Sequence, residues 1–154
     1  MENYIIQNKS AWEYDAYNFW IQEAGLPSER AEKIKENPIK HLKRYAKYFD
    51  SYEGKKIANI CGSCGKKAVP LAVLGAEVTI FDISKENKKY ALELAECAGV
   101  SLEYVLGDVL EVDRNKYQKF VLKYIDVLAN ELYSIRNGDS RLNVLDYKWE
   151  NKRG

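Results

Sequence analysis

The sequence is poor in the residues from which many catalytic and metal sites are built. It has one histidine, His41, and three cysteines, Cys61, Cys64 and Cys97. With a single histidine, neither a Ser-His-Asp triad nor a histidine cluster that would bind a metal can be assigned. We therefore expect no metal site. An odd cysteine count without a framework pattern is not typical of a disulfide-stabilised secreted domain, and it favours a reducing, cytoplasmic setting.

The chain also lacks an excess of one charge and long apolar runs. It carries 24 basic and 23 acidic residues, for a net charge of +1. This balance indicates no general attraction to nucleic acid, so we expect none as a partner. No basic segment followed by an apolar run begins the sequence, and no apolar stretch is long enough to span a bilayer. We therefore expect neither a signal peptide nor a membrane partner.

What the chain does have is the composition of a folded domain. It has 154 residues, of which 46% are hydrophobic, enough for one domain with its own core. Apolar residues at helical spacing predict helices over 8–24 and 38–49, the second capped by Asn37 and with Ile39 on its apolar face. A short polar helix over 28–36 is expected between them. We interpret 1–53 as an N-terminal helical cap and 54–154 as a nucleotide-binding portion.

Residues 57–84, IANICGSCGKKAVPLAVLGAEVTIFDIS, form the most informative stretch. They predict a strand over 56–61, a loop of small residues, a helix ending at Leu74, and a second strand over 77–81. A further helix over 85–98, capped by Ser84, and a strand over 102–106 follow. Strands alternating with helices predict a parallel sheet, and small residues before a helix allow backbone N–H groups to approach a ligand. Asp82 ends the second strand, where an acid accepts hydrogen bonds from ribose hydroxyls.

This stretch resembles motifs I and II of the class I S-adenosylmethionine-dependent methyltransferases, and Gly107-Asp108-Val109 resembles their third motif. The resemblance implies an α/β, Rossmann-like three-layer sandwich with a mostly parallel sheet. It implies S-adenosylmethionine as cofactor and a transferred methyl group. Because nothing in the sequence indicates nucleic-acid reading, we expect a small-molecule acceptor. The residues that the resemblance places at the cofactor are Asn59, Cys61, Gly62, Ser63, Gly65, Asp82, Ile83, Asp108 and Val109.

The sequence departs from the family in two respects. Cys61 and Ser63 stand where the family loop has glycines, and Asn59 stands where the family often has an acid. The chain is also short for a seven-stranded sheet, so we expect an incomplete fold. In residues 114–154 the spacing of apolar residues favours a long helix over 121–135, while 124–130 read as a fourth strand is the alternative. No catalytic residue can be assigned.

Other functions stay open. A catalytically inactive methyltransferase remnant, binding cofactor or a partner protein, is the main alternative, and an exposed sheet edge would then favour a homodimer. A dinucleotide-binding domain would also use Asp82, but the loop lacks its glycine pattern. Cys61 and Cys64 form a CxxC, which does redox chemistry in some proteins. The basic stripe of Lys40, Lys43, Arg44 and Lys47 is either a solvated helix face or a phosphate contact. Four aromatic residues near the N-terminus, Trp12, Tyr14, Tyr17 and Trp20, either pack in the core or close over a ligand.

Overall fold

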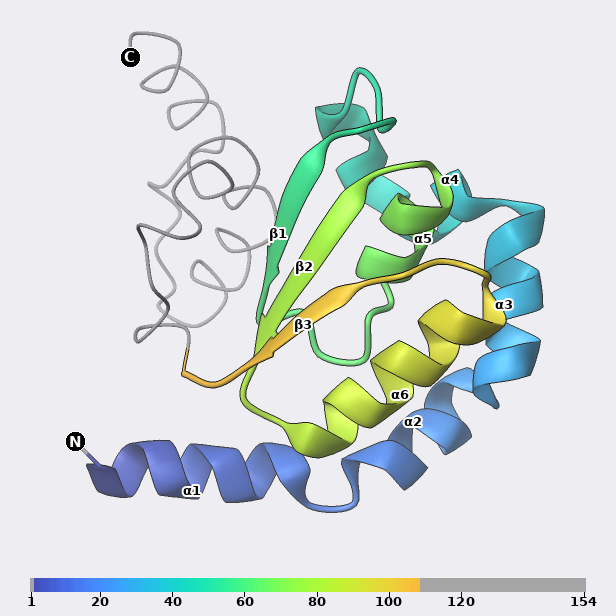
Figure 1. The fold of residues 1–154 in the computed structure, drawn as a ribbon. Coiled ribbons are helices and arrows are strands. Elements are labelled where there is room, and N and C mark those ends of the chain that lie inside the picture. The colour runs from blue at the N-terminus through green and yellow to red at the C-terminus, as the bar shows by residue number, and fades with distance from the viewer. Residues whose placement is uncertain (1, 109–154) are drawn as a thin grey trace, which may run out of the picture.

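A computed structural model describes residues 2–108 of the chain (Figure 1). Its helices and strands are, in order, α1 (Glu2–Glu13), α2 (Ala16–Ala24), α3 (Pro27–Glu36), α4 (Pro38–Leu42), the 3-10 helix η1 (Lys43–Tyr48), β1 (Lys56–Ile60), α5 (Ala68–Val73), β2 (Glu77–Asp82), α6 (Lys85–Cys97) and β3 (Glu103–Leu106). None of the helices in this described part is both long and apolar enough to cross a membrane.

The three strands form one parallel sheet in the order β1-β2-β3. Ile57 lies beside Val78, and Ile80 lies beside Tyr104. All three strands therefore end at the same edge of the sheet, as the sequence predicts. The fold is α/β and has the features of an incomplete Rossmann-like fold. Within the described sheet β1 pairs with β2 alone, so the expected pairing of this edge with a second chain stays a prediction.

A hydrophobic core joins one face of the sheet to the helices. Ile57, Val78, Ile80 and Tyr104 project from alternate positions of the strands and pack with Leu71 of α5. A second cluster ties α3 to α5 and α6: it contains Ala31, Ile34, Cys64, Val69, Tyr90, Leu94, Ala95 and Ala98. Figure 1 shows α3, α5 and α6 on the same side of the sheet. Apolar burial thus holds α3 to the helices that cover the sheet.

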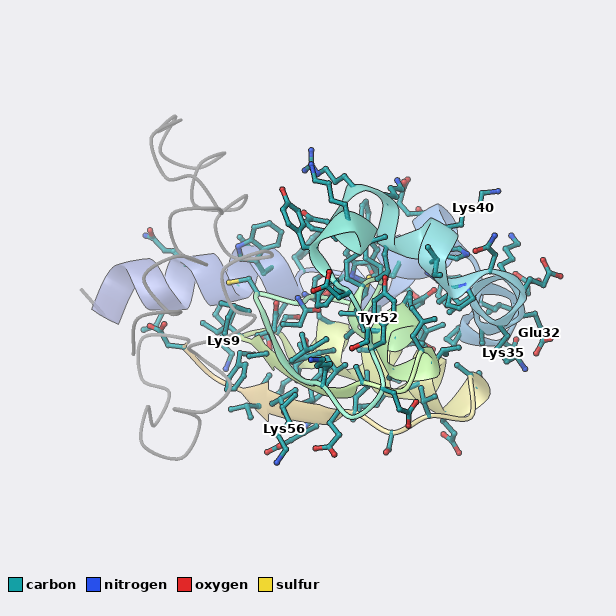
Figure 2. All side chains as sticks on the ribbon, turned by 90° about the horizontal axis from the view of Figure 1, so that it is seen from above. Lys9, Glu32, Lys35, Lys40, Tyr52 and Lys56 are labelled. Carbon is teal, nitrogen blue, oxygen red and sulfur yellow. The ribbon has the colours of Figure 1, made fainter. Side chains whose placement is uncertain are left out.

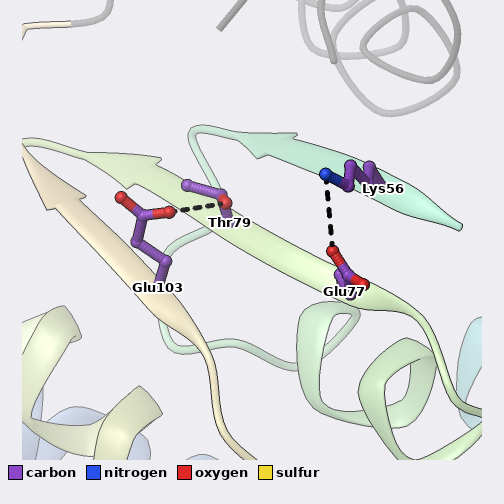
Figure 3. A network of polar contacts seen from close by, with 4 residues as sticks. All are labelled: Lys56, Glu77, Thr79 and Glu103. Carbon is purple, nitrogen blue, oxygen red and sulfur yellow. Dashed lines mark hydrogen bonds and ion pairs between the residues drawn. The ribbon is translucent and has the colours of Figure 1, made fainter. Parts of the chain in front are cut away.

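Polar contacts mark the opposite end of the strands from the candidate site (Figure 3). Lys56 Nζ lies 3.9 Å from Glu77 Oε2 at the beginning of β1 and β2. Nearby, Thr79 Oγ1 donates to Glu103 Oε2 at 3.3 Å. Because Lys56 and Glu77 are 56% and 65% exposed, their ion pair contributes little to stability.

The prediction of one helix over 8–24 is wrong. The chain forms α1 and α2, separated at Asp15, which has a left-handed φ of 50°. Asp15 tolerates this conformation better than most residues, and its Oδ1 accepts a hydrogen bond from Asn18 Nδ2 at 2.7 Å. The apolar spacing continues across the break, which is why the pattern alone indicated one helix.

The segment 38–49 is likewise not one helix. Asn37 caps α4 as predicted, since its Oδ1 accepts the Lys40 N–H at 3.1 Å. At Lys43, where φ is 54°, the chain changes to the 3-10 helix η1. Ile39 was expected on the apolar face but is 50% exposed, whereas Leu42 and Phe49 are buried.

The alternation from β1 to β3 is confirmed, with small shifts in the bounds. The helix after β1 is short, and Pro70 lies in its first turn, where its missing N–H costs nothing. Ser84 caps α6, because its Oγ accepts the Asn87 N–H at 3.2 Å. The alternatives for residues 114–154 lie outside the described residues. Within the described part, α3, α5 and α6 supply one helical layer of the expected three-layer sandwich.

Candidate cofactor site at the carboxyl ends of the strands

The loop between β1 and α5 takes the backbone conformation expected of a glycine loop without having all its glycines. Cys61, Ser63 and Gly65 have φ values of 51°, 52° and 77°. These are the three positions at which the related motif carries glycine. Cys61 and Ser63 hold the left-handed conformation despite their Cβ atoms, at a cost of about 1–2 kcal/mol each. The rest of the fold therefore maintains the loop.

Gly62 is fixed by close packing. A Cβ atom added there would lie 2.7 Å from Asn59 Oδ1 and 2.8 Å from Ile80 Cγ2. The Gly62 N–H donates to the Phe81 carbonyl at 3.3 Å, so the loop lies against the end of β2. The absence of a side chain at Gly62 is what lets the loop come this close to the sheet.

Asp82, at the end of β2, connects the loop to α6. Its Oδ2 accepts the Ser63 N–H at 3.0 Å, and its Oδ1 accepts the Ser84 N–H at 3.0 Å. Asn87 Nδ2 also donates to Oδ1, at 3.4 Å. The carboxylate thus holds both the loop and the beginning of α6. Asp82 therefore helps to cap α6 and also lies beside the loop that is expected to bind the ligand.

These contacts leave Asp82 room for a ligand. A carboxylate offers about four lone-pair positions, two on each oxygen. Oδ1 uses both of its positions on Ser84 and Asn87, whereas Oδ2 uses one on Ser63. Counting contacts among residues 2–108 only, one acceptor position stays on Oδ2, enough for one ribose hydroxyl.

Tyr104 supports the loop from β3, and sequence reasoning missed it. Its hydroxyl donates to the Ser63 carbonyl at 2.9 Å. The side chain is buried, and burial, together with the nearby Asp82 charge, raises the pKa of the Tyr104 hydroxyl, which therefore stays a donor. A tyrosine within the predicted strand was the available signal, because a buried tyrosine hydroxyl usually has a partner.

Asn59 lies beneath the loop with an unsatisfied acceptor. The residue is 4% exposed, and its Oδ1 is buried without a hydrogen-bond partner in the described part of the protein. Buried polar atoms are normally satisfied, so this oxygen is suited to accept from a ligand. The same reasoning applies whether the donor reaches it directly or through water.

The ends of β2 and β3 meet beside Asp82. Gly107 N–H donates to the Asp82 carbonyl at 2.9 Å, which brings Asp108 to the same edge of the sheet. Ile83 and Asp108 are both half-buried. Val109, the last residue assigned from the resemblance, lies outside the described residues.

The aromatic residues near the N-terminus take different places. Trp12 and Tyr14 are 64% and 87% exposed. Tyr17 donates its hydroxyl to Glu93 of α6, and Trp20 Nε1 donates to Asn87 Oδ1 at 2.7 Å. Because Asn87 contacts Asp82, Trp20 acts as an outer support of the site.

The cysteines and the histidine show no catalytic arrangement. Cys64 is buried in the core, where burial raises its thiol pKa, while Cys61 is exposed; all three cysteines are free thiols. A buried thiol with a raised pKa is a poor redox group. His41 Nε2 contacts the Lys33 carbonyl at 3.1 Å, and burial lowers its pKa. Residues 2–108 contain no group of three potential metal ligands.

Comparison with known proteins gives one informative similarity. No family model matches the chain. Over 77 residues the chain is 27% identical to ribosomal RNA small subunit methyltransferase B of Thermus thermophilus. This similarity supports a methyltransferase in general. The match covers 50% of this chain and 19% of the Thermus protein, so the chain spans only a small part of that relative's length.

Proposed function

We propose that the chain binds S-adenosylmethionine and belongs to a methyltransferase. The observation that carries this proposal is the Asp82 carboxylate, which holds the Ser63 N–H of the loop and, in the part of the chain that the structure describes, keeps one acceptor position on Oδ2. This arrangement lies at the carboxyl ends of parallel strands, where open α/β sheets bind nucleotide ligands. The similarity to a methyltransferase supports the same conclusion.

The residues present fit this cofactor. The loop 62–65 would lie against its methionine end, with the Gly62, Ser63 and Gly65 N–H groups already donating within the protein. Asp82 would face its ribose, and Asp108 with Val109 its adenine. The unpaired Asn59 Oδ1 is the kind of buried acceptor that a ligand N–H satisfies. S-adenosylmethionine supplies a methyl group on a positively charged sulfur. The contribution of this chain is to orient that group and to exclude water from it.

RNA is the acceptor class that we propose. The balanced net charge led us to expect a small molecule, but the comparison does not support that expectation. The similar Thermus protein is by name a ribosomal RNA methyltransferase. An RNA acceptor also agrees with a concentration of cations on the helices, described below.

The test is thermal unfolding of the full chain with different ligands. S-adenosylmethionine and S-adenosylhomocysteine should raise the midpoint, since a ligand at 100 times its Kd adds about 2.7 kcal/mol to stability. NAD at the same concentration should not. A rise with NAD alone would overturn the proposal in favour of a dinucleotide-binding domain. Transfer of a tritiated methyl group to RNA then separates an active enzyme from an inactive remnant.

A further inference from the structure

Two segments of the chain are free of acidic residues and rich in cations. No Asp or Glu occurs in 37–49, which contains Lys40, Lys43, Arg44 and Lys47. None occurs in 54–76 either, which contains Lys55, Lys56, Lys66 and Lys67. The net charge of +1 therefore hides an uneven distribution along the chain.

The fold brings parts of these two segments together. Lys67, just before α5, donates a hydrogen bond from Nζ to the carbonyl of His41 in α4. Burial, followed by the positive charges of Lys43, Lys66, Arg30 and Arg44, lowers the pKa of Lys67 to about 8. The charges of Arg30, Lys67 and Lys40 likewise lower the pKa of His41. We call this group the basic surface: Arg30, Lys40, Lys43, Arg44, Lys66 and Lys67.

Aromatic rings lie among these cations. Arg44 Cζ and Lys67 Nζ are 5.5 Å and 5.4 Å from the centre of the Tyr45 ring, which is half-buried. Lys66 Nζ is 5.8 Å from the Trp20 ring. Cations interleaved with aromatic rings are typical of proteins that contact both phosphates and unpaired bases.

Like charges held this close repel one another, and a polyanion relieves that repulsion. Lys66 and Lys67 of the basic surface directly follow Gly65, so this part of the surface adjoins the candidate cofactor loop. A single phosphate would use one or two of these cations, whereas a nucleic-acid backbone places a charge opposite each of several.

We infer that the basic surface binds the phosphate backbone of single-stranded RNA, with the Tyr45 and Trp20 rings lying beside its cations. The choice of RNA as the polyanion rests on the proposed function. The clustering of the cations does not, because the fold alone establishes it.

The test compares two double variants of the full chain by fluorescence anisotropy with a labelled single-stranded RNA of mixed sequence. Lys40→Ala/Lys43→Ala removes two charges from the basic surface, and Lys9→Ala/Lys56→Ala removes two elsewhere. Figure 2 shows Lys40 on the opposite side of the ribbon from Lys9 and Lys56. We expect the first variant to lose about tenfold in affinity, and its slope of log K against log salt to become shallower by about 1.4, the value for two phosphate contacts. The second should change affinity less than threefold, at an unchanged slope.

Equal losses in both variants would overturn the inference, because net charge alone would then govern binding. Absence of RNA binding by the wild type would also overturn it. Displacement of RNA by polyglutamate at an equal concentration of charges would do so too, and would point to an acidic protein partner. S-adenosylhomocysteine titrations of the same proteins separate the two proposals. A loss of RNA binding while S-adenosylhomocysteine still binds bears only on the inference about the basic surface. Absence of S-adenosylhomocysteine binding to the wild type bears on the proposed function.

Discussion

Single residues keep the candidate loop in a glycine-like shape. Cys61 and Ser63 have left-handed φ values, and Asp82 and Tyr104 hold the two backbone groups of Ser63. The sequence predicted the loop and Asp82, because a strand, small residues and an acid at the next strand end form a local pattern. It did not predict the contact of Tyr104 with Ser63, since that depends on strand register between residues 41 positions apart.

Ser63→Gly should stabilise the protein by about 0.5–1 kcal/mol. Relief of the left-handed backbone contributes about 1–2 kcal/mol, and the greater freedom of glycine in the unfolded chain offsets part of it. Urea unfolding measures the difference. Ser63→Val is the matched control and should destabilise, because a branched side chain tolerates a positive φ poorly. Destabilisation by the glycine would show that the Ser63 side chain has a role of its own.

Tyr104→Phe should lower both stability and cofactor affinity. It removes the hydroxyl that donates to the Ser63 carbonyl, at a cost of about 1 kcal/mol, and loosens the loop. Tyr90→Phe is the control, because its hydroxyl donates at 2.8 Å to the Gly25 carbonyl, away from the loop. The two variants should lose similar stability in urea, while titration with S-adenosylhomocysteine should show weaker binding only for Tyr104→Phe. An equal loss of affinity in Tyr104→Phe and Tyr90→Phe would show that Tyr104 does not position the loop.

The observed helices and strands match the predicted ones where local sequence signals agree with tertiary packing. The strands and α6 lie near their predicted bounds because apolar periodicity, the Ser84 cap and Gly99 all point to the same ends. The N-terminal helices did not, since the left-handed residues Asp15 and Lys43 interrupt them without disturbing the apolar spacing. Such breaks depend on tertiary contacts, such as those of α2 with α6, which no local pattern contains.

Ser84→Ala should destabilise the protein by about 1 kcal/mol through the loss of a helix cap. Ser84 is fully buried and its Oγ accepts the Asn87 N–H, so water cannot replace it. Because Asn87 also contacts Asp82, affinity for S-adenosylhomocysteine should fall with stability. Ser101→Ala, at an exposed residue before β3, is the control for chemical denaturation and should change neither quantity.

For the molecule as a whole, the distribution of charge is more informative about binding partners than the net charge. The balance of 24 basic and 23 acidic residues indicated no nucleic-acid partner. The fold nevertheless gathers cations from α3, α4, η1 and the loop before α5. The sequence indicated the stripe that contains Lys40, Lys43 and Arg44. It did not indicate that Arg30 and Lys67 join this stripe, because they are far apart along the chain and meet only through helix packing.

RNA affinity should fall as the pH rises from 7 to 9. In the free protein the pKa of Lys67 is lowered to about 8, by burial and by Lys43, Lys66, Arg30 and Arg44. Bound phosphate favours the charged amine, so binding takes up a proton near pH 8 and weakens above it. His41, whose pKa lies below its usual value, is neutral throughout this range. Anisotropy titrations at pH 7, 8 and 9 measure the trend, and Lys67→Ala should flatten it. A pH-independent affinity in the wild type would show that RNA does not approach Lys67.

The most direct measurement of the central claim is calorimetric titration of residues 1–154 with S-adenosylhomocysteine, for the wild type and for Asp82→Ala and Asp82→Asn. Circular dichroism confirms that each protein is folded. The wild type should bind one ligand per chain, and both variants should bind at least about tenfold more weakly, as expected for the loss of a charge-assisted hydrogen bond. Absence of heat from a folded, monodisperse wild type would contradict the account, and so would equal affinity in folded Asp82 variants.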